Sequence, residues 1–303
     1  MRLPALIGGL TLLTLSVACS QTQSDDQNKQ PKAGQRKGGK GNSDDRRKDQ
    51  DAAAQVPGLR RVGSLKGIVP ESSGLCPAPQ AGTFYSFGDG GNGSALYQLD
   101  GTGQLLGKLE LGIENIDWES LTRDEQGTYY IGDCGNNESS RRDLRLHRLR
   151  PDQPNQISTI NFTYPDQTEF PPKKKARNFD CEAIVARDGQ VYLFTKDQGQ
   201  ERESKVYAVP TTPGDHEARL MARLPIPGQV TDAALSPDGR RLVLLGRGEL
   251  FILDGNSWAD ILKAPPRQIP LTGAGQTEGC AFKDANTLLI STEQGALYEY
   301  ALP

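Results

Sequence analysis

Histidine is scarce in this chain, in which His147 and His216 are the only two among 303 residues. Two histidines exclude the multi-histidine sites that hold many metal ions, and they argue against histidine acid–base catalysis. Methionine is also rare, with 2 residues, whereas glycine is abundant, with 34. This composition argues against a helical bundle and favours a β protein rich in turns.

Neither sign of charge is in large excess. The chain has 35 Lys and Arg residues against 38 Asp and Glu residues, which gives a formal net charge of -3. Binding to the phosphates of nucleic acid needs a positive surface, so nucleic acid is not an expected partner. The sequence also lacks a Gly-x-Ser-x-Gly nucleophile motif, a Cys-x-x-Cys pair and a phosphate-binding loop.

A long apolar run occurs at the N-terminus. Met1 and Arg2 precede the apolar residues 3–18, a segment that is too short for a transmembrane helix but typical of a secretory signal. The end of this segment and Cys19 resemble a bacterial lipobox, although Leu15 lies four residues before the cysteine instead of three. We therefore predict a signal peptide over 1–18 and lipidation of Cys19. The alternative is an ordinary cleaved signal followed by an incidental cysteine.

The residues after Cys19 predict a tether. Ser20 stands where lipoproteins retained in the inner membrane have aspartate, which favours the outer membrane, with the domain in the periplasm or at the cell surface. Residues 20–56 are mostly Gln, Lys, Asp, Gly and Ser. Such a stretch buries too little apolar surface to offset its ordering entropy. We therefore predict that 19–56 comprise the lipidated cysteine and a disordered linker, and that 57–303 form the folded domain.

This domain repeats one pattern of strands. Five segments share a polar start, a small residue, an apolar residue, a turn and a second strand, and they begin at residues 71, 117, 180, 231 and 277. A period of about 40–50 residues with four strands in each repeat is typical of a β-propeller. The last repeat lacks a fourth strand, and residues 59–65 resemble the fourth strands of the other repeats. The sequence thus predicts an all-β propeller of five blades, closed by an N-terminal strand. Six blades are the alternative if 152–179 contain a degenerate blade.

Short motifs resemble those of a family of exported bacterial propellers. Residues 117–121 (DWESL) resemble its DWED-L motif, 132–137 with Arg141 resemble its GDIGDN-x3-R motif, and 236–239 read SPDG. The likeness covers 68–300, with Cys134 and Asn136 departing from the usual residues. The family is similar to propellers called phytase-like or esterase-like. The resemblance therefore implies a fold, and it implies calcium-assisted phosphoester or ester hydrolysis as one alternative activity.

Acidic residues recur at aligned places in the repeats. Strand alternation predicts a ring at one channel mouth, made of Ser73, Glu119, Glu182, Asp232 and Glu278. The ends of the second strands return to the same face and carry Asp89, Asp133, Asp197 and Glu293. Calcium prefers several oxygen ligands, so the four acids of the ring are predicted metal ligands. The alternative is that the acids cap turns and pair with Arg141 or with backbone N–H groups.

Further polar residues near the ring are predicted to bind a ligand. These residues are Asp117, Trp118, Asp133, Asn137, Arg141, Asp180 and Lys196. A wedge between two blades is the alternative for Trp118. No residue is assigned to catalysis. We predict a monomeric, non-enzymatic module of the cell envelope, held to the membrane by its lipid, that recognises a small ligand or an envelope protein.

Four cysteines remain besides Cys19. An even number of cysteines in an exported domain suggests disulfides. Cys134 ends the second strand of blade two and Cys181 starts blade three, which favours this pair. Cys76 and Cys280 lie on the blades that meet at ring closure and are the second predicted pair. The alternative is four buried free thiols, which behave as small apolar residues.

Overall fold

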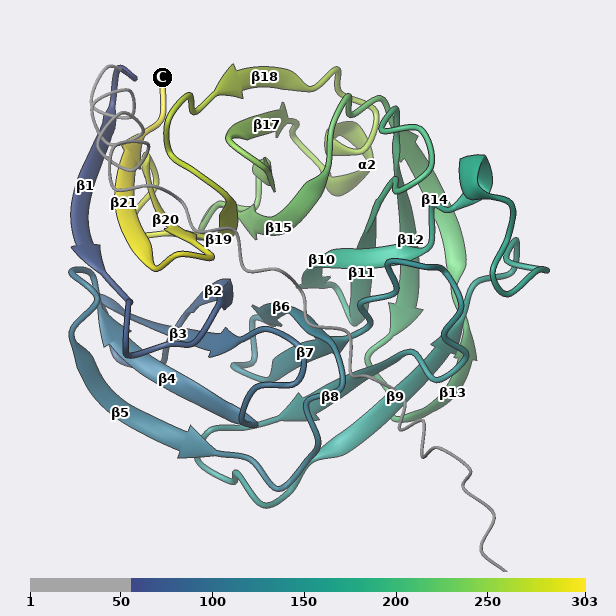
Figure 1. Ribbon diagram of the computed structural model, residues 1–303, viewed down its shortest axis with the longest axis horizontal. Coiled ribbons are helices and arrows are strands. Elements are labelled where there is room, and N and C mark those ends of the chain that lie inside the picture. Colours follow the sequence, from purple (N-terminus) through teal and green to yellow (C-terminus); the bar gives the residue numbers. More distant parts are fainter. Residues whose placement is uncertain (1–55) are drawn as a thin grey trace, which may run out of the picture. The chain divides into compact units, whose positions relative to one another are not determined.

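A computed structural model describes residues 56–303. The predicted signal peptide, the predicted lipidation of Cys19 and nearly all of the predicted linker lie outside these residues. The described strands form five sheets, four of which have four strands and one of which has five. The sheets are arranged as blades around a central axis (Figure 1). The prediction of an all-β propeller with five blades is therefore confirmed.

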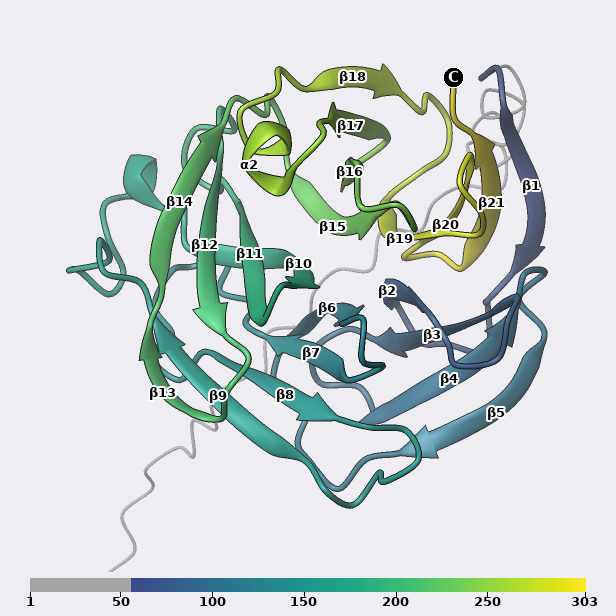
Figure 2. The same cartoon turned by 180° about the vertical axis from the view of Figure 1, so that it is seen from behind.

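The first two blades follow the predicted repeats. Blade one contains β2 (Ser72–Pro77), β3 (Thr83–Gly88), β4 (Ala95–Asp100) and β5 (Leu105–Glu110). Blade two contains β6 (Trp118–Arg123), β7 (Tyr129–Asp133), β8 (Arg145–Leu149), β9 (Ser158–Thr163) and an added strand, β13 (Gly214–Glu217). In each blade the first strand of the repeat is the innermost, so each repeat runs outward from the axis (Figures 1 and 2).

The other three blades complete the ring. Blade three contains β10 (Asp180–Arg187), β11 (Gln190–Lys196), β12 (Ser204–Pro210) and β14 (Arg219–Leu224). Blade four contains β15 (Val230–Leu235), β16 (Arg241–Gly246), β17 (Glu249–Asp254) and β18 (Arg267–Pro270). Blade five contains β19 (Thr277–Phe282), β20 (Thr287–Thr292), β21 (Ala296–Ala301) and β1 (Leu59–Ser64). The two short helices are η1 (Lys174–Ala176) and α2 (Trp258–Ile261).

The N-terminal strand closes the ring as predicted. β1 pairs antiparallel with β21, from Leu59 opposite Tyr300 to Ser64 opposite Ala296. Both ends of the described chain therefore lie in blade five (Figure 2). The pairing covers a sheet edge that would otherwise expose unpaired backbone groups, and it joins the two ends of the propeller.

Blade two has a fifth strand that the sequence did not predict. β13 comes from the connection between β12 and β14 of blade three, and it pairs in parallel with β9. It covers the outer edge of blade two, where an edge would otherwise be open. The alternative of a sixth blade in 152–179 is wrong, because that stretch contains only β9 and η1.

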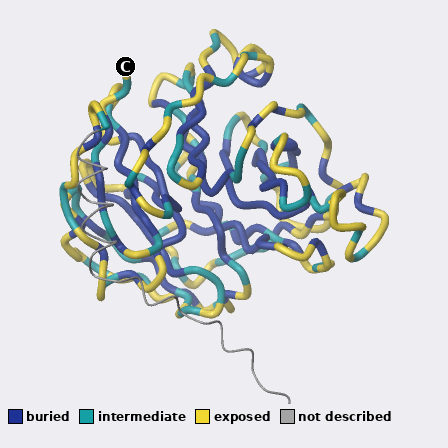
Figure 3. Tube along the Cα trace, turned by 45° about the horizontal axis from the view of Figure 1, so that its top comes forward, coloured by how far each residue is buried: buried dark blue, intermediate teal, exposed yellow. Residues whose placement is uncertain are grey.

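The core lies between neighbouring blades. Trp118 of β6 is fully buried and packs edge-on against Phe87 of β3, with ring centroids 6.0 Å apart. Buried residues follow the strands, and exposed residues are concentrated in the connections (Figure 3). Within residues 56–303 no helix is long and apolar enough to cross a membrane.

Candidate functional site

All five innermost strands have an irregular register near the same mouth of the channel. The irregularities fall at 72–75, 118–120, 181–183, 230–232 and 277–279. A β-bulge bends a strand and redirects a side chain. Four of the five bulges contain a single residue, and these are Glu119, Glu182, Thr231 and Glu278. Three of the four predicted ring acids therefore occupy equivalent positions.

Asp232 does not belong to this set. It pairs with Leu245 immediately after the bulge, as Ser120 pairs with Gly132, so the predicted alignment was wrong by one residue in blade four. Thr231 occupies the equivalent position. One unpaired residue in each of four inner strands shifts the alternation of the side chains, and the sequence motifs did not show where that residue lies.

The carboxylate of Asp232 instead joins four blades inside the channel. The side chain is completely buried and accepts hydrogen bonds from Cys280 N at 2.8 Å and Ser120 Oγ at 2.9 Å. A longer bond of 3.4 Å comes from Leu75 N. These donors belong to blades five, two and one. The described contacts therefore give Asp232 a structural role.

Three carboxylates meet beside blades one and two. One oxygen from each of Asp89, Asp117 and Glu119 lies within 4.8 Å of the others. Asp89 follows β3, Asp117 precedes β6 and Glu119 is the bulge residue of β6. The sequence placed all three at this mouth, but it had not singled out Asp89 as a ligand. Carboxylate oxygens at such separations can surround a hard cation.

Two glycines give these carboxylates their space. A Cβ atom on Gly135 would lie 2.5 Å from Asp117 Oδ2 and would also overlap Glu119 Oε1. A Cβ atom on Gly90 would lie 2.5 Å from Asp117 Oδ1. Any larger residue at either position would displace the Asp117 side chain. The glycine at position 135 of the GDCGNN motif thus has a steric explanation in this site.

Glu119 and Asp117 of the three-carboxylate group lie in an environment that disfavours their charged forms. Glu119 is only 7% exposed, and the hydroxyl of Ser73 donates to its Oε2 at a distance of 3.5 Å. Burial raises the pKa of Glu119 well above its usual range, and the nearby charges of Glu182 and Asp89 raise it further. Burial also raises the pKa of Asp117 to about 6, although the Arg141 guanidinium, 4.0 Å away, lowers it. Repulsion between like charges therefore remains partly uncompensated.

The other ring acids have cationic partners. Lys196 Nζ donates to Glu182 Oε1 at 2.9 Å, and both side chains are buried. Burial lowers the pKa of Lys196, but the carboxylates of Glu182 and Asp180 outweigh it and raise the pKa overall. Glu278 lies 3.7 Å from Arg247 Nε, and burial followed by repulsion from Glu182 raises its pKa to about 8. The acidic mouth thus combines paired and poorly paired carboxylates.

Several predicted ligand-binding residues connect parts of the protein to one another. Arg141 donates to Asp133 Oδ1 at 3.0 Å and to the Gly135 carbonyl at 2.8 Å, so it holds the loop after β7. Gln198 donates to Asn137 Oδ1 and to Asp180 Oδ2, each at 2.7 Å. These contacts agree with the alternative in which the acids pair with protein groups.

Trp118 also makes only protein contacts. Its indole N–H donates to the Glu114 carbonyl at 3.3 Å, and the side chain is buried between blades one and two. A buried side chain of this kind has no face on which a ligand could stack. Among the predicted ligand-binding residues, Asp117 is the one that belongs to the three-carboxylate group.

All four cysteines of the described domain are buried free thiols in the structure. The predicted Cys134–Cys181 and Cys76–Cys280 disulfides are therefore absent from it. Cys134 Sγ donates to the Cys181 carbonyl at 3.5 Å, and Cys181 Sγ donates to the Ala183 carbonyl at 3.8 Å. The thiols of Cys134 and Cys181 thus each have a backbone acceptor. Burial raises the pKa of Cys134, which disfavours the reactive thiolate.

No protein-family model matches the chain, and no curated protein matches it. Among solved structures, it resembles virginiamycin B lyase from Staphylococcus aureus at 13% identity, with 77% of this chain and 67% of that one covered and a TM-score of 0.42. It resembles the PQQ-bound aldose sugar dehydrogenase from Streptomyces coelicolor at 12% identity, with 80% of this chain and 97% of that one covered and a TM-score of 0.48. It also resembles a gluconolactonase from Xanthomonas campestris at 16% identity, with 80% of this chain and 91% of that one covered and a TM-score of 0.46. Such low identities concern the fold alone.

Proposed function

We propose that this protein is a non-enzymatic binding module of the cell envelope, whose acidic mouth captures a positively charged ligand. The observation that carries the proposal is the group of Asp89, Asp117 and Glu119, whose oxygens approach one another within 4.8 Å. The lipobox-like Cys19 and the motifs shared with exported propellers support the envelope location. The protein would be a monomer held to the membrane by its lipid.

A divalent cation, or a cationic group of a small ligand or envelope protein, would relieve the repulsion at this site. Calcium is the simplest candidate, because it takes several carboxylate ligands in flexible geometry. Asp89, Asp117 and Glu119 would hold it, and the cradle formed by Gly90 and Gly135 admits no side chain beyond Cα. Bound calcium would supply a positive charge to these carboxylates and could bridge them to an anionic partner.

Calcium-assisted phosphoester or ester hydrolysis is the second candidate. It is favoured by carboxyl groups of raised pKa beside cationic side chains, since Glu278 has a pKa of about 8 next to Arg247. A phosphate ester would also need basic groups that are free to bind it. Lys196 is instead paired with Glu182, and Arg141 is paired with Asp133. We therefore rank binding above hydrolysis.

Calcium is expected to raise the melting temperature of the protein. Binding to the native state alone stabilises it by about 2.7 kcal/mol at a hundredfold excess over the dissociation constant. Asp117→Asn with Glu119→Gln should abolish the response, whereas Glu125→Gln with Asp152→Asn, outside the site, should preserve it. Protons compete for the same oxygens, so the response should shrink as the pH falls through about 6, the pKa of Asp117. Scanning fluorimetry with calcium or chelator measures each case.

Two outcomes would contradict this proposal. An unchanged melting curve with calcium and with a cationic peptide would leave the acids with structural roles only. Calcium-dependent turnover of p-nitrophenyl phosphate or p-nitrophenyl acetate that is lost in Glu119→Gln would favour the hydrolase instead.

The membrane anchor has its own test. Cells that express the protein are expected to incorporate labelled palmitate into it, and Cys19→Ser should abolish the label and release the protein into soluble fractions. Diacylation supplies the apolar chains that hold such a protein to a bilayer. An unlabelled protein that stays in the membrane fraction would show that the uncleaved N-terminal apolar segment holds it.

A further inference from the structure

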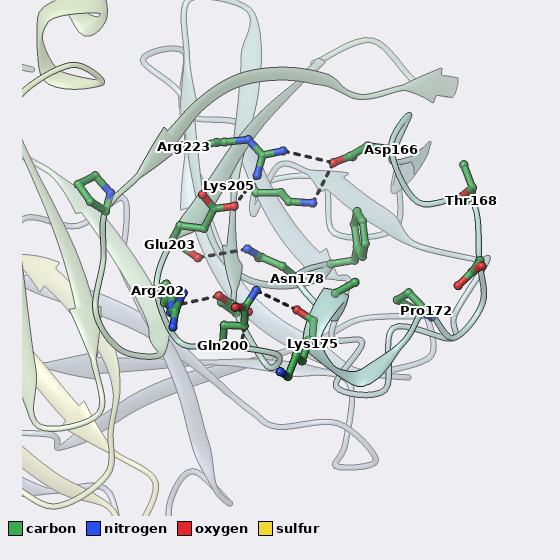
Figure 4. A pocket seen from close by; sticks show the side chains of 15 residues that line it. Asp166, Thr168, Pro172, Lys175, Asn178, Gln200, Arg202, Glu203, Lys205 and Arg223 are labelled. Carbon is green, nitrogen blue, oxygen red and sulfur yellow. Dashed lines mark hydrogen bonds and ion pairs between the residues drawn. The ribbon is translucent and has the colours of Figure 1, made fainter.

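A pocket of about 650 Å³ lies on blade three, away from the three-carboxylate group. Two connections form its sides, one between β9 and β10 and the other between β11 and β12 (Figure 4). Lys205 of β12 and Arg223 of β14 lie on its outer side. Pockets of this size accommodate small organic molecules.

Several charged groups of the pocket are already satisfied by protein partners. Lys205 Nζ donates to Asp166 Oδ2 at 2.8 Å, and Arg223 pairs with Glu203. Asp197 accepts three backbone N–H groups at 2.9–3.1 Å, all from the turn that follows it. Figure 4 draws the pairs of Lys205 with Asp166 and of Arg223 with Glu203 as dashed lines. These bonds hold the walls of the pocket in place, and the groups that form them have few hydrogen-bonding positions left for a ligand.

The charged side chains of the lining that have no ion-pair partner are mostly cationic. Within the described chain, the side chains of Lys175, Arg202 and Glu169 take part in no ion pair, and all three residues are exposed. Lys175 and Arg202 bring up to eight N–H donors against the two acceptor oxygens of Glu169. Neither cation would lose an existing ion pair when a ligand binds.

Lys175 and Arg202 are held on facing connections. Gln200 Nε2 donates to the Lys175 carbonyl at 3.2 Å, which ties the β11–β12 turn to η1. Gly199 packs so closely here that a Cβ atom would lie 2.7 Å from the same carbonyl oxygen. Residues 199 and 200 are thus in direct contact with residue 175. Lys175 lies at this junction, and Arg202 follows it two residues further along the chain.

Apolar surfaces complete the lining. Pro172, Ala176, Phe179 and Pro225 are the apolar residues of the lining. Lys205 Nζ lies 3.9 Å from the centre of the Phe179 ring, so one face of that ring is occupied. A ligand can therefore bury an apolar portion against this lining while its charged group meets the cations.

We propose that this pocket binds a small organic anion, whose carboxylate or phosphate group is held by Arg202 and Lys175. Guanidinium and ammonium groups form strong charge-assisted hydrogen bonds with such anions. The apolar part of the anion lies against the apolar part of the lining, which includes Pro172. The pocket shares no residue with the three-carboxylate group, so the protein would have two binding regions of opposite charge preference.

Calorimetric titration of the full chain with phenyl phosphate and with benzoate tests this site. Binding with a dissociation constant of about 1 mM or below is expected. Arg202→Gln with Lys175→Gln should weaken it at least about tenfold, the effect of losing one charge-assisted hydrogen bond. Glu169→Gln should strengthen it, because a negative charge is removed from the lining. Stronger binding of phenyl phosphate would assign the site to phosphate esters, and stronger binding of benzoate would assign it to carboxylates.

The matched control removes two cations that do not line the pocket, in Lys174→Gln with Arg219→Gln. Equal weakening in this control would reveal non-specific attraction and overturn the proposal, as would the absence of binding of either probe. Asp117→Asn with Glu119→Gln should leave titration with either anion unchanged. A failure at the acidic mouth is thereby distinguished from a failure at this pocket.

Discussion

Replacing Asp232 with alanine is expected to lower the free energy of unfolding by about 3–5 kcal/mol. The substitution would remove the acceptor for Cys280 N, Ser120 Oγ and Leu75 N. Each buried donor left without a partner costs about 1–3 kcal/mol. Because these donors lie on three other blades, the loss would loosen the centre of the ring and lower the cooperativity of unfolding.

Asparagine at position 232 keeps the shape of the aspartate side chain but replaces its carboxyl group with an amide. Asp232→Asn keeps one acceptor oxygen but turns an N–H donor toward other donors, so its stability should fall between those of the wild type and Asp232→Ala. Urea denaturation measures all three proteins, and the exposed Asp152→Ala serves as the control. A loss below about 1 kcal/mol in Asp232→Ala would contradict the proposed role.

The pH dependence gives a second measure of Asp232. Burial raises its pKa to about 8, while the N–H donors of Cys280 and Ala233 lower it. A carboxyl group with a raised native pKa binds more protons in the native state than in the unfolded state. Its contribution to stability therefore falls as the pH rises from the unfolded pKa, about 4, to about 8. Asp232→Asn should lack this fall when its stability is compared with that of the wild type.

Replacing Lys196 with methionine is expected to destabilise the protein by about 3–5 kcal/mol. The substitution leaves Glu182 buried without the ammonium group that lies 2.9 Å from its Oε1. Burial raises the pKa of Asp180, and the same cation lowers it by stabilising the carboxylate. Asp180 would therefore also lose a compensating charge. Burial raises the pKa of Glu182 to about 8 even though the Lys196 charge lowers it. Without that charge the pKa would rise further, so the loss should be larger at pH 8 than at pH 5.

The double variant tests whether the pair is coupled. Lys196→Met with Glu182→Gln removes both charges and should recover most of the lost stability, since a well-packed neutral pair avoids the cost of desolvation. Guanidinium denaturation of the wild type, both single variants and the double variant completes the cycle. Additive losses would show that the two side chains stabilise the protein independently.

The sequence determined the architecture because the architecture depends on local and repeated features. Turn residues and alternating strands recur with the propeller period, and each blade needs the same pattern in order to bury its two faces. The N-terminal strand was recognisable because 59–65 resemble the outer strands and the last repeat lacks one. The mouth at which Glu119, Glu182 and Glu278 gather also followed from strand direction, since antiparallel neighbours return to the same face.

Only the tertiary structure decided which acidic residues lie close together and which groups are their hydrogen-bond and ion-pair partners. A single bulge residue in four of the inner strands shifts the side chains, and in blade four this residue is Thr231, which separates Asp232 from the ring acids. β13 acquires its strand conformation from the edge of β9, since a segment of four residues has too few side chains to show the alternation. The approach of Asp89 to Asp117 and Glu119 depends on contacts between blades and on the space left by Gly90 and Gly135. Such distances arise from the packing of distant segments, which local sequence patterns do not encode.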